Sequence, residues 1–380
     1  MSVVKFGDVV KEVKSKIDRN NNPYEFYVAG DHMDSEDLHL HRKGSFATDD
    51  VGPAFIREFL PGQILYGSRR TYLKKVAVAD FSGVTANTTF VLETKNEKVL
   101  RQRLIPFIML SDAFTEWSIS KSKGSTNPYV LFSDLAGFEF ELPTIEEQDK
   151  LVNLLWSMDD VIVSYKDAIA KTDDLVKSQF IEMFGDPVYN TMDWPTKPIK
   201  DIAPESNACI PEENEYWWLN LDMIESYSGM LVDKVIEKAD AIGNSTHAFD
   251  SSMVLYSKLR PYLNKAIVPD GYGYATTELV CLKPNPVELN KYFLFNLLRG
   301  DCFLNFATKC SSGAQMPRMP MRVLREFPCI LPPMELQNKF VEFAEQSDKS
   351  KFALKDTMKS VEAMINKIVT NSFKIDREEG

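Results

Sequence analysis

Two segments of the chain, residues 144–187 and 332–375, place hydrophobic side chains at alternating steps of four and three residues. This spacing is typical of the seam of a coiled coil, and no proline or glycine interrupts residues 145–184. The breaker Gly185-Asp186-Pro187 follows the first helical pattern. We predict one long helix in each segment, with a seam that includes Leu151, Leu155, Met158, Ile162, Phe340, Leu354, Met358 and Ile365.

The two helical segments are copies of each other. When the sequence is aligned with itself, 142–152 falls on 331–341, and six of the eleven positions are identical. Further upstream, a shift that is longer by a single position places 65–75 on 255–265. The chain therefore has the order domain, helix, domain, helix. We expect the first domain at 1–143, the helices at 144–187 and 332–375, the second domain at 188–331 and a tail at 376–380.

A hydrophobic stripe also suits a helix that is buried inside a single domain. A helix of about 40 residues is about 60 Å long, however, and a domain of about 140 residues does not accommodate that length. We therefore expect each long helix to pair with its own copy. The order of the segments lets the chain return on itself, so the pair is expected to be antiparallel and to form within one chain.

The two domains combine short hydrophobic runs with longer amphipathic segments. The runs predict strands at 76–79, 90–92, 253–255 and 279–282, and the segments predict helices at 100–117 and 289–309. Each domain is thus expected to be a sheet with flanking helices. The predicted fold class is α+β, with two pseudo-repeat α/β domains joined by two long antiparallel coiled-coil helices.

Composition limits the class of protein. With 44% hydrophobic and 26% charged residues among 380, the chain has the balance of a globular protein rather than of a disordered segment or a fibre. No apolar run reaches the roughly 18 residues that cross a bilayer, and the first residues do not resemble a signal peptide, so we expect no membrane association. The five cysteines include no C-x-x-C pair, which favours reduced thiols in a cytoplasm and argues against structural zinc.

The net charge of −11 argues weakly against nucleic-acid binding, but its distribution along the chain has to be considered first. Residues 144–188 hold ten Asp or Glu and four Lys or Arg, a net of −6, so over half of the excess lies in the first helical segment. The two domains are close to neutral, and either one has enough cations for a basic face.

Most of the candidate chemistry is weak. No G-x-x-x-x-G-K-[ST] or G-x-G-x-x-G loop is present, so we expect no nucleotide hydrolysis by this chain. Asn127-Pro128-Tyr129 resembles a loop of adenine-N6 methyltransferases but lacks the second proline, and a plain turn is favoured. Asp80 with Glu93-Thr94-Lys95 resembles a nuclease motif, although a charged hairpin end is favoured. His39 and His41 are too few for a metal site and are expected on the solvated surface.

One kind of element occurs twice, a basic and aromatic stretch at 66–75 and 256–265. Arginine suits contacts with phosphate or guanine, and aromatic rings pack on sugars or bases. A polar loop centred on glycine follows in each domain, at 120–126 and 308–315, where backbone N–H groups can reach phosphate. The alternative is a structural turn whose charges are merely solvated. The candidate DNA-binding residues are Arg69, Arg70, Tyr72, Lys74, Lys123, Ser125, Lys258, Arg260, Tyr262, Lys265, Ser312 and Gln315.

The duplicated order resembles the specificity (S) subunit of type I restriction-modification systems. Leu142-Pro143 with Glu146-Glu147-Gln148, and Leu331-Pro332-Pro333 with Glu335-Leu336-Gln337, each open a long helix after a glycine-centred loop. The stretch at 256–263, Tyr-Ser-Lys-Leu-Arg-Pro-Tyr-Leu, matches another signature of that family. The first copy departs from this signature, with Thr71 where Pro261 stands in the second.

The resemblance implies two target recognition domains, each specific for one half of a split, asymmetric stretch of double-stranded DNA. It implies that the helices dock modification (methyltransferase) subunits, with or without restriction (motor-nuclease) subunits. Those partners would bind S-adenosylmethionine, or ATP and Mg, so this chain is expected to be cytoplasmic, non-catalytic, and without a cofactor or metal of its own. Three alternatives remain open: a protein-binding coiled-coil scaffold, a fused methyltransferase, which the missing cofactor loops disfavour, and a specificity subunit that serves a methyltransferase without a nuclease.

Overall fold

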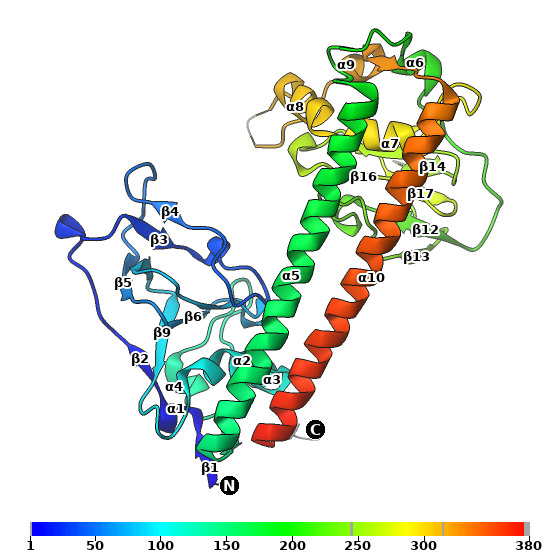
Figure 1. Ribbon diagram of the computed structural model, residues 1–380. Coiled ribbons are helices and arrows are strands. Elements are labelled where there is room, and N and C mark those ends of the chain that lie inside the picture. The colour runs from blue at the N-terminus through cyan, green and yellow to red at the C-terminus, as the bar shows by residue number, and fades with distance from the viewer. Residues whose placement is uncertain (1, 244–245, 314, 376–380) are drawn as a thin grey trace. The chain divides into compact units, whose positions relative to one another are not determined.

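The computed structural model describes residues 2–243, 246–313 and 315–375 (Figure 1). The chain divides into two compact units, Met1–Lys166 with Lys355–Gly380, and Asp167–Leu354. Each unit contains one domain and about half of each long helix, α5 (Ile145–Phe184) and α10 (Met334–Phe373). These compact units are defined by contacts, and their limits fall in the middle of both long helices. They therefore do not test the domain limits inferred from the repeat, which stay a prediction.

Both long helices are confirmed. Helix α5 begins after Pro143 and Thr144, and it ends before Gly185, whose φ of +72° is readily adopted only by glycine. A Cβ atom at Gly185 would lie 2.4 Å from Oγ1 of Thr191, so the close return of the chain also requires glycine there. Helix α10 begins after Pro332-Pro333, where proline is compatible with a helix start.

The first domain contains two four-stranded sheets and a short two-stranded one. One has the order β2 (Val10–Val13), β9 (Thr89–Thr94), β6 (Ile64–Gly67), β7 (Val76–Val78) and is antiparallel throughout. The other has the order β4 (Gly44–Ser45), β3 (Phe26–Val28), β8 (Gly83–Ala86), β5 (Phe55–Phe59), with β3 and β8 parallel. Strand β1 (Ser2–Lys5) pairs with β10 (Glu139–Leu142) beside the start of α5. The strands predicted at 76–79 and 90–92 are thereby confirmed.

The second domain repeats this framework with local changes. Strands β16 (Ala266–Ile267), β15 (Val254–Ser257) and β18 (Leu279–Leu282) correspond to β7, β6 and β9, and the predicted strands at 253–255 and 279–282 are confirmed. A second sheet has the order β13 (Val235–Lys238), β12 (Glu215–Leu219), β17 (Gly273–Thr276), β14 (Thr246–Phe249). Strands β11 (Thr196–Pro198) and β19 (Pro328–Ile330) form the counterpart of β1 and β10.

Residues 100–117 and 289–309 are largely helical as predicted, but neither range forms one continuous helix. The first is divided into a 3-10 turn, η4 (Gln102–Leu104), then α2 (Ile105–Leu110) and α3 (Asp112–Ser120). The second is divided into α7 (Lys291–Arg299) and α8 (Asp301–Cys310). The breaks lie at Ser111 and Gly300, both extended, with ψ near 149° and 148°. Apolar side chains continue across both breaks, so their pattern did not reveal them.

The remaining elements are short. The first domain has the helices α1 (Phe6–Val9) and α4 (Phe132–Leu135) and the 3-10 turns η1 (Arg19–Asn21), η2 (Gly30–His32) and η3 (Thr71–Leu73). The second has the helices α6 (Ile199–Ile202) and α9 (Met321–Glu326) and the 3-10 turns η5 (Leu221–Met223) and η6 (Pro261–Leu263). In the part of the chain that the structure describes, no helix is both long and apolar enough to cross a membrane.

The helix halves belong to the core of each unit. In the first unit, Leu155 near the start of α5 and Val369 and Phe373 near the end of α10 lie in one buried cluster with Phe6 and Phe114. In the second unit, Phe180 and Phe184 at the end of α5 contact Phe340 near the start of α10, with ring centroids 5.2 and 5.7 Å apart. The start of each helix thus meets the end of the other, so the pair is antiparallel.

The predicted seam positions face inward to different degrees. Leu155, Ile162 and Phe340 are buried, whereas the other five, Leu151, Met158, Leu354, Met358 and Ile365, are half-buried. Burial of this kind stabilises the helix pair, because each fully buried aliphatic side chain contributes about 1.5–3 kcal/mol relative to exposure. Their role in docking a partner stays a prediction.

Candidate nucleic-acid interface

The basic and aromatic stretch of the first domain forms a tight turn. Strand β6 runs into η3, which is entered at Arg70 with φ 51° and left at Lys74 with φ 46°. Left-handed backbone is uncommon for residues other than glycine, and each such position costs of order 1 kcal/mol or more. Two of them so close together therefore need support from the surrounding structure.

That support comes from the glycine-centred loop. The backbone N–H of Arg70 donates to the carbonyl of Pro128 at 2.7 Å, and that of Val130 donates to the carbonyl of Ser68 at 3.0 Å. Lys123 and Tyr129 exchange both of their backbone hydrogen bonds across the loop, at 2.8 and 2.9 Å. The two elements that the sequence singled out, although well separated along the chain, therefore form one surface, which we name the turn-and-loop surface of residues 68–75 and 121–130.

The second domain builds the same surface from residues 258–265 and 311–319. Arg260 has φ 47° and Asn264 has φ 49°, and the N–H of Arg260 donates to the carbonyl of Pro317 at 2.7 Å. The N–H of Met319 donates to the carbonyl of Lys258 at 2.9 Å, the counterpart of the bond from Val130 to Ser68. Ser312 and Arg318 exchange backbone hydrogen bonds as Lys123 and Tyr129 do.

Most of the candidate DNA-binding side chains point outward from these surfaces. In the first domain the exposed ones are Arg69, Arg70, Tyr72, Lys123 and Ser125. In the second domain Tyr262, Ser312 and Gln315 are exposed, and Lys258 and Arg260 are half-buried. The structure thus brings cations, tyrosines and loop hydroxyls together in each domain, a combination suited to phosphate contacts and to contacts with base edges.

Two candidate lysines point elsewhere. Nζ of Lys74 lies 2.8 Å from a carboxylate oxygen of Glu36 and 3.0 Å from one of Asp112. Burial by itself would lower the pKa of Lys74, but its hydrogen bonds to these carboxylates outweigh burial and raise that pKa. Nζ of Lys265 donates to the carbonyl of Leu221 at 2.7 Å. For these two lysines the geometry favours a structural role over DNA contact.

The two equivalent arginines are used differently. The side chain of Arg70 is exposed and makes no hydrogen bond or ion pair within the described part of the chain. Nη2 of Arg260 lies 3.4 Å from the carbonyl of Gln315, and its Nε is buried without a partner among the described residues. Arg260 therefore folds over its own loop, whereas Arg70 is free to meet a ligand.

His39 and His41 lie at the surface, with side chains 36% and 50% exposed, but His39 also has a partner that the sequence did not predict. Its Nε2 lies 2.7 Å from a carboxylate oxygen of the buried Asp159 on α5, and this hydrogen bond raises the pKa of His39. Beside it, Asp37 accepts from Lys166 of α5 at 2.7 Å and contacts His41 at 3.2 Å. His39 and Asp37 thus tie a loop of the first domain to the long helix. Among the residues that the structure describes, no group of three His, Cys, Asp or Glu could hold a metal ion.

The comparison with protein families shows to which family the chain belongs. A family model described as the type I restriction modification DNA specificity domain matches the chain twice, over residues 1–171 and 191–362. The chain belongs to this family. The two matches coincide with the two repeats found in the sequence, so the duplication is a duplication of this domain together with much of the helix that follows it.

Curated relatives agree with this family. The chain is 22% identical over 304 residues to the EcoDI specificity subunit of a type I restriction enzyme from Escherichia coli, which covers 68% of this chain and 66% of that protein. It is 25% identical over 315 residues to the MjaIX specificity subunit from Methanocaldococcus jannaschii, which covers 75% and 70%. The aligned region is thus just under two thirds of the length of the first relative.

Solved structures show the same fold. A chain from work on complex assembly and conformational transition of the type I R-M system is similar with a TM-score of 0.54 and 18% identity, covering 98% of this chain and 97% of that one. The type I restriction-modification S subunit from M. genitalium is similar with a TM-score of 0.50 and 12% identity, covering 98% and 96%. At these identities the likeness establishes the fold.

Proposed function

We propose that this chain is the DNA-specificity subunit of a type I restriction-modification complex, and that each domain contacts one half of a split, asymmetric target in double-stranded DNA. The observation that carries this proposal is the duplicated turn-and-loop surface, which has the same backbone in both domains but different side chains. Two surfaces with the same backbone conformation can dock on DNA in the same orientation, while their different side chains select different bases.

The side chains of the first surface divide into two kinds of DNA contact. Arg69 and Arg70 offer cations that suit phosphate oxygens or the edge of guanine, whereas Nζ of Lys123 lies 3.0 Å from a carboxylate oxygen of Asp134. Tyr72 is 54% exposed and offers a ring and a hydroxyl to sugars or bases. Such a mixture supports both non-specific affinity, through the phosphates, and sequence preference, through the bases.

The long helices suit the docking of partner proteins. Leu154, Val161 and Leu175 on α5 are 47%, 39% and 52% exposed, and their spacing of one heptad and then two heptads places them on one face. Apolar side chains in an acidic segment suit a protein partner better than DNA. We propose that modification subunits dock on this face, and restriction subunits join where the system has them.

In this proposal, methyl transfer and cleavage belong to the partners. The modification subunit would bind S-adenosylmethionine, and a restriction subunit would bind ATP and Mg. The chain itself selects the DNA site at which these partners act. The assembled complex would act in the cytoplasm, where the partners meet DNA.

The test is to co-express the chain with its cognate modification subunit and to map methylated adenines across the host DNA by sequencing. We expect one split motif with an unspecified gap. We expect no methyl transfer when the purified chain alone is mixed with S-adenosylmethionine and DNA. A short continuous palindrome, or methyl transfer by the isolated chain, would contradict the proposal.

A further inference from the structure

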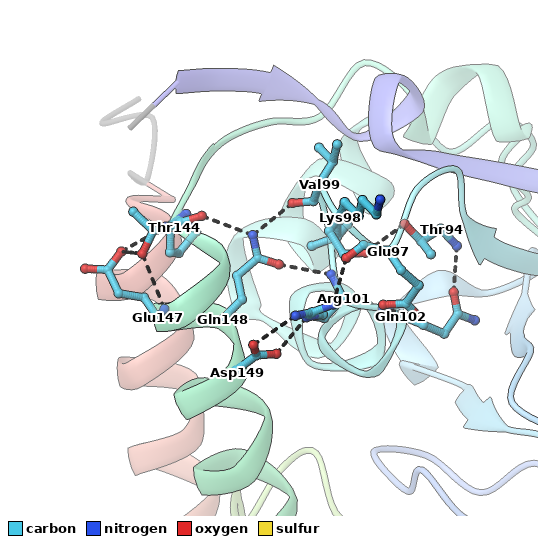
Figure 2. A network of polar contacts seen from close by, with 12 residues as sticks. Thr94, Glu97, Lys98, Val99, Arg101, Gln102, Thr144, Glu147, Gln148 and Asp149 are labelled. Atoms are coloured by element: carbon cyan, nitrogen blue, oxygen red, sulfur yellow. Dashed lines mark hydrogen bonds and ion pairs between the residues drawn. The ribbon is translucent and has the colours of Figure 1, made fainter.

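One buried glutamine ties the start of α5 to the first domain (Figure 2). Gln148 is fully buried. Its Nε2 donates to the carbonyls of Val99 at 2.9 Å and of Pro143 at 3.0 Å, and its Oε1 accepts from the backbone N–H of Arg101 at 3.0 Å. Both amide hydrogens are thus used, and the side chain joins the helix to a loop of the domain that lies far upstream in the sequence.

The second repeat contains the same arrangement. Gln337 is fully buried at the start of α10. Its Nε2 donates to the carbonyls of Glu288 at 3.0 Å and Pro332 at 2.7 Å, and its Oε1 accepts from the N–H of Asn290 at 2.9 Å. Each of the four positions follows from the first repeat by the same shift that places 142–152 on 331–341. We name the two arrangements the glutamine clasps.

The side chains around the clasps differ although the clasps do not. In the first clasp Arg101 makes a bidentate ion pair with Asp149, at 2.7 and 2.9 Å (Figure 2). At the equivalent positions of the second clasp, Nδ2 of Asn290 donates to Oδ1 of Asn338 at 2.9 Å. An ion pair in one repeat and an amide hydrogen bond in the other thus connect the same two backbone segments. Both repeats retain the connection, although the side chains that make it differ.

From this geometry we infer that Gln148 and Gln337 are positioning residues that fix the direction in which each long helix leaves its domain, and that they thereby set the gap between the two half-sites. This inference rests on the proposed function. Each clasp holds the first turns of its helix, and about half of that helix then packs in the core of the same unit. Over the roughly 27 Å of helix beyond the packed half, a tilt of about 7° displaces the far end by about one base-pair step of 3.4 Å.

The burial of the clasps supports a role in direction rather than in affinity. No clasp atom belongs to the turn-and-loop surfaces, so a change there leaves the DNA-facing side chains in place. Breaking a clasp leaves two carbonyls and one N–H of the backbone without their partner, and this loss loosens the joint. A loosened joint permits several gaps instead of one.

The experiment uses the full chain co-expressed with its modification subunit. The substrate is a plasmid library that carries the two half-sites separated by the native gap, or by gaps one or two base pairs shorter or longer. Methylation at each gap is counted by sequencing for the wild type, Gln148→Met and Gln337→Met. We expect the ratio of methylation at the native gap to methylation at neighbouring gaps to fall about tenfold in both variants, with both half-sites unchanged, as about 1.4 kcal/mol of lost restraint would produce.

Two variants with smaller expected effects keep the test informative if Gln148→Met does not assemble with the modification subunit. Asp149→Asn removes the charged tie on an exposed part of the first clasp, and we expect the ratio to fall about twofold, in keeping with the small energy of exposed ion pairs. Asp149→Asn combined with Arg101→Asn recreates the amide pair of the second clasp, and we expect it to restore the ratio. The matched control is Asp167→Asn, which removes the exposed pair of Asp167 with Lys171 on the same helix and should leave the ratio unchanged.

The possible results separate the two hypotheses. If the wild type itself shows no split target, the proposed function fails. If the wild type shows one, and Gln148→Met lowers total methylation while the gap preference stays as sharp, the glutamines only hold the fold and the inference is overturned. If Gln148→Met does not assemble, Asp149→Asn decides the matter, and a ratio equal to that of the wild type overturns the inference.

Discussion

The two domains share a backbone frame but not the side chains that it presents. Arg70 and Arg260 take the same left-handed conformation and accept the same support from the glycine-centred loop. Around them the residues change, with Lys74 replaced by Asn264 and Tyr129 by Arg318. A strained turn that is retained under such divergence indicates that its shape is required in both domains. We interpret the shared shape as the docking frame and the changing side chains as the basis of two different half-sites.

A second difference lies where the domains meet the helices. Asp159 and Asp348 occupy equivalent positions of α5 and α10. Asp159 pairs with His39 of the first domain, whereas Asp348 pairs with Lys351 of its own helix at 2.7 Å, and Lys351 also contacts Asp173 of α5. The first domain is thus tied to the helix pair through a histidine, whereas Asp348 has a lysine of its own helix as its partner.

The largest expected effect distinguishes the inner face of α5 from its outer face. Leu155 is fully buried and Leu154 is 47% exposed. Leu155→Asp should lower the free energy of unfolding by about 3–5 kcal/mol, because it removes a core side chain and buries a charge. Leu154→Asp should lower it by less than about 1 kcal/mol but should weaken partner docking.

Denaturant unfolding and co-purification with the modification subunit measure these two effects. Leu354→Asp lies at a half-buried seam position and should fall between the two variants. Equal stability of Leu155→Asp and the wild type would show that the assigned inner face is wrong.

The next effect compares the two arginines. Arg70→Gln removes an exposed, unpaired cation and should weaken DNA binding by about 1–3 kcal/mol. If the lost contact is to phosphate, the loss should be uniform across sequences and the salt slope should fall by about one unit; if it is to a base, one position of one half-site should relax. Arg260→Gln should have the smaller direct effect, because that side chain already contacts its own loop.

Binding titrations at several salt concentrations, carried out with the assembled complex, make this comparison. Normal affinity and specificity in both variants would remove the arginines from the interface.

A smaller effect tests the breaks between helices. Ser111 caps α3, with its hydroxyl oxygen accepting from the N–H of Phe114 at 3.3 Å, whereas the equivalent Gly300 has no side chain to cap α8. Ser111→Ala should cost about 1 kcal/mol of stability, and Gly300→Ser should gain a few tenths, about 0.3–0.5 kcal/mol. A Cβ atom at Gly300 has only ordinary contacts, at 3.4 Å or more. A loss of stability in Gly300→Ser, measured by thermal unfolding, would contradict this interpretation.

The smallest effect is the part of the pH dependence of stability that His39 contributes. The pKa of His39 is raised above its ordinary value of 6.5 by the hydrogen bond to Asp159, so its contribution is fully present below pH 6.5. That contribution is lost as the pH rises through the raised pKa of the folded state. Because His39 is 36% exposed and solvent screens the pair, the change should be about 0.5 kcal/mol or less.

His39→Gln should remove this part of the pH dependence, whereas His247→Gln in the second unit should not. Unfolding midpoints between pH 6 and pH 9, measured by denaturant titration, provide the comparison. An identical pH profile in the wild type and His39→Gln would show that the contact with Asp159 has no energetic weight.

Periodicity and duplication together predict much of this fold. The heptad spacing of apolar positions in 145–184 persists over five heptads, and a pattern of that length has no other regular explanation in a proline-free segment. The breaks at Ser111 and Gly300 were not predicted, because both residues are compatible with a helical pattern and apolar positions continue on either side. The two glycine-centred loops were found because the repeat aligned them.

Side-chain partners were harder to predict than elements. The twelve candidate DNA-binding residues came from residue type alone, and residue type does not tell an exposed lysine from one that faces Glu36 and Asp112, as Lys74 does. His39 gave no sign of its contact with Asp159, because the two lie far apart in the sequence. Gln148 and Gln337 occupy equivalent positions of the two repeats, and this identity was the available clue to a shared contact.

An exchange of one domain shows whether the two domains, which share a backbone frame, recognise two different half-sites. Residues 1–141 are replaced by the matching segment of another specificity subunit, and the chimera is expressed with its modification subunit before methylated adenines are mapped by sequencing. We expect one half of the split motif to change while the other half remains that of the parent chain. A motif in which both halves change together, or a short continuous palindrome, would contradict this expectation.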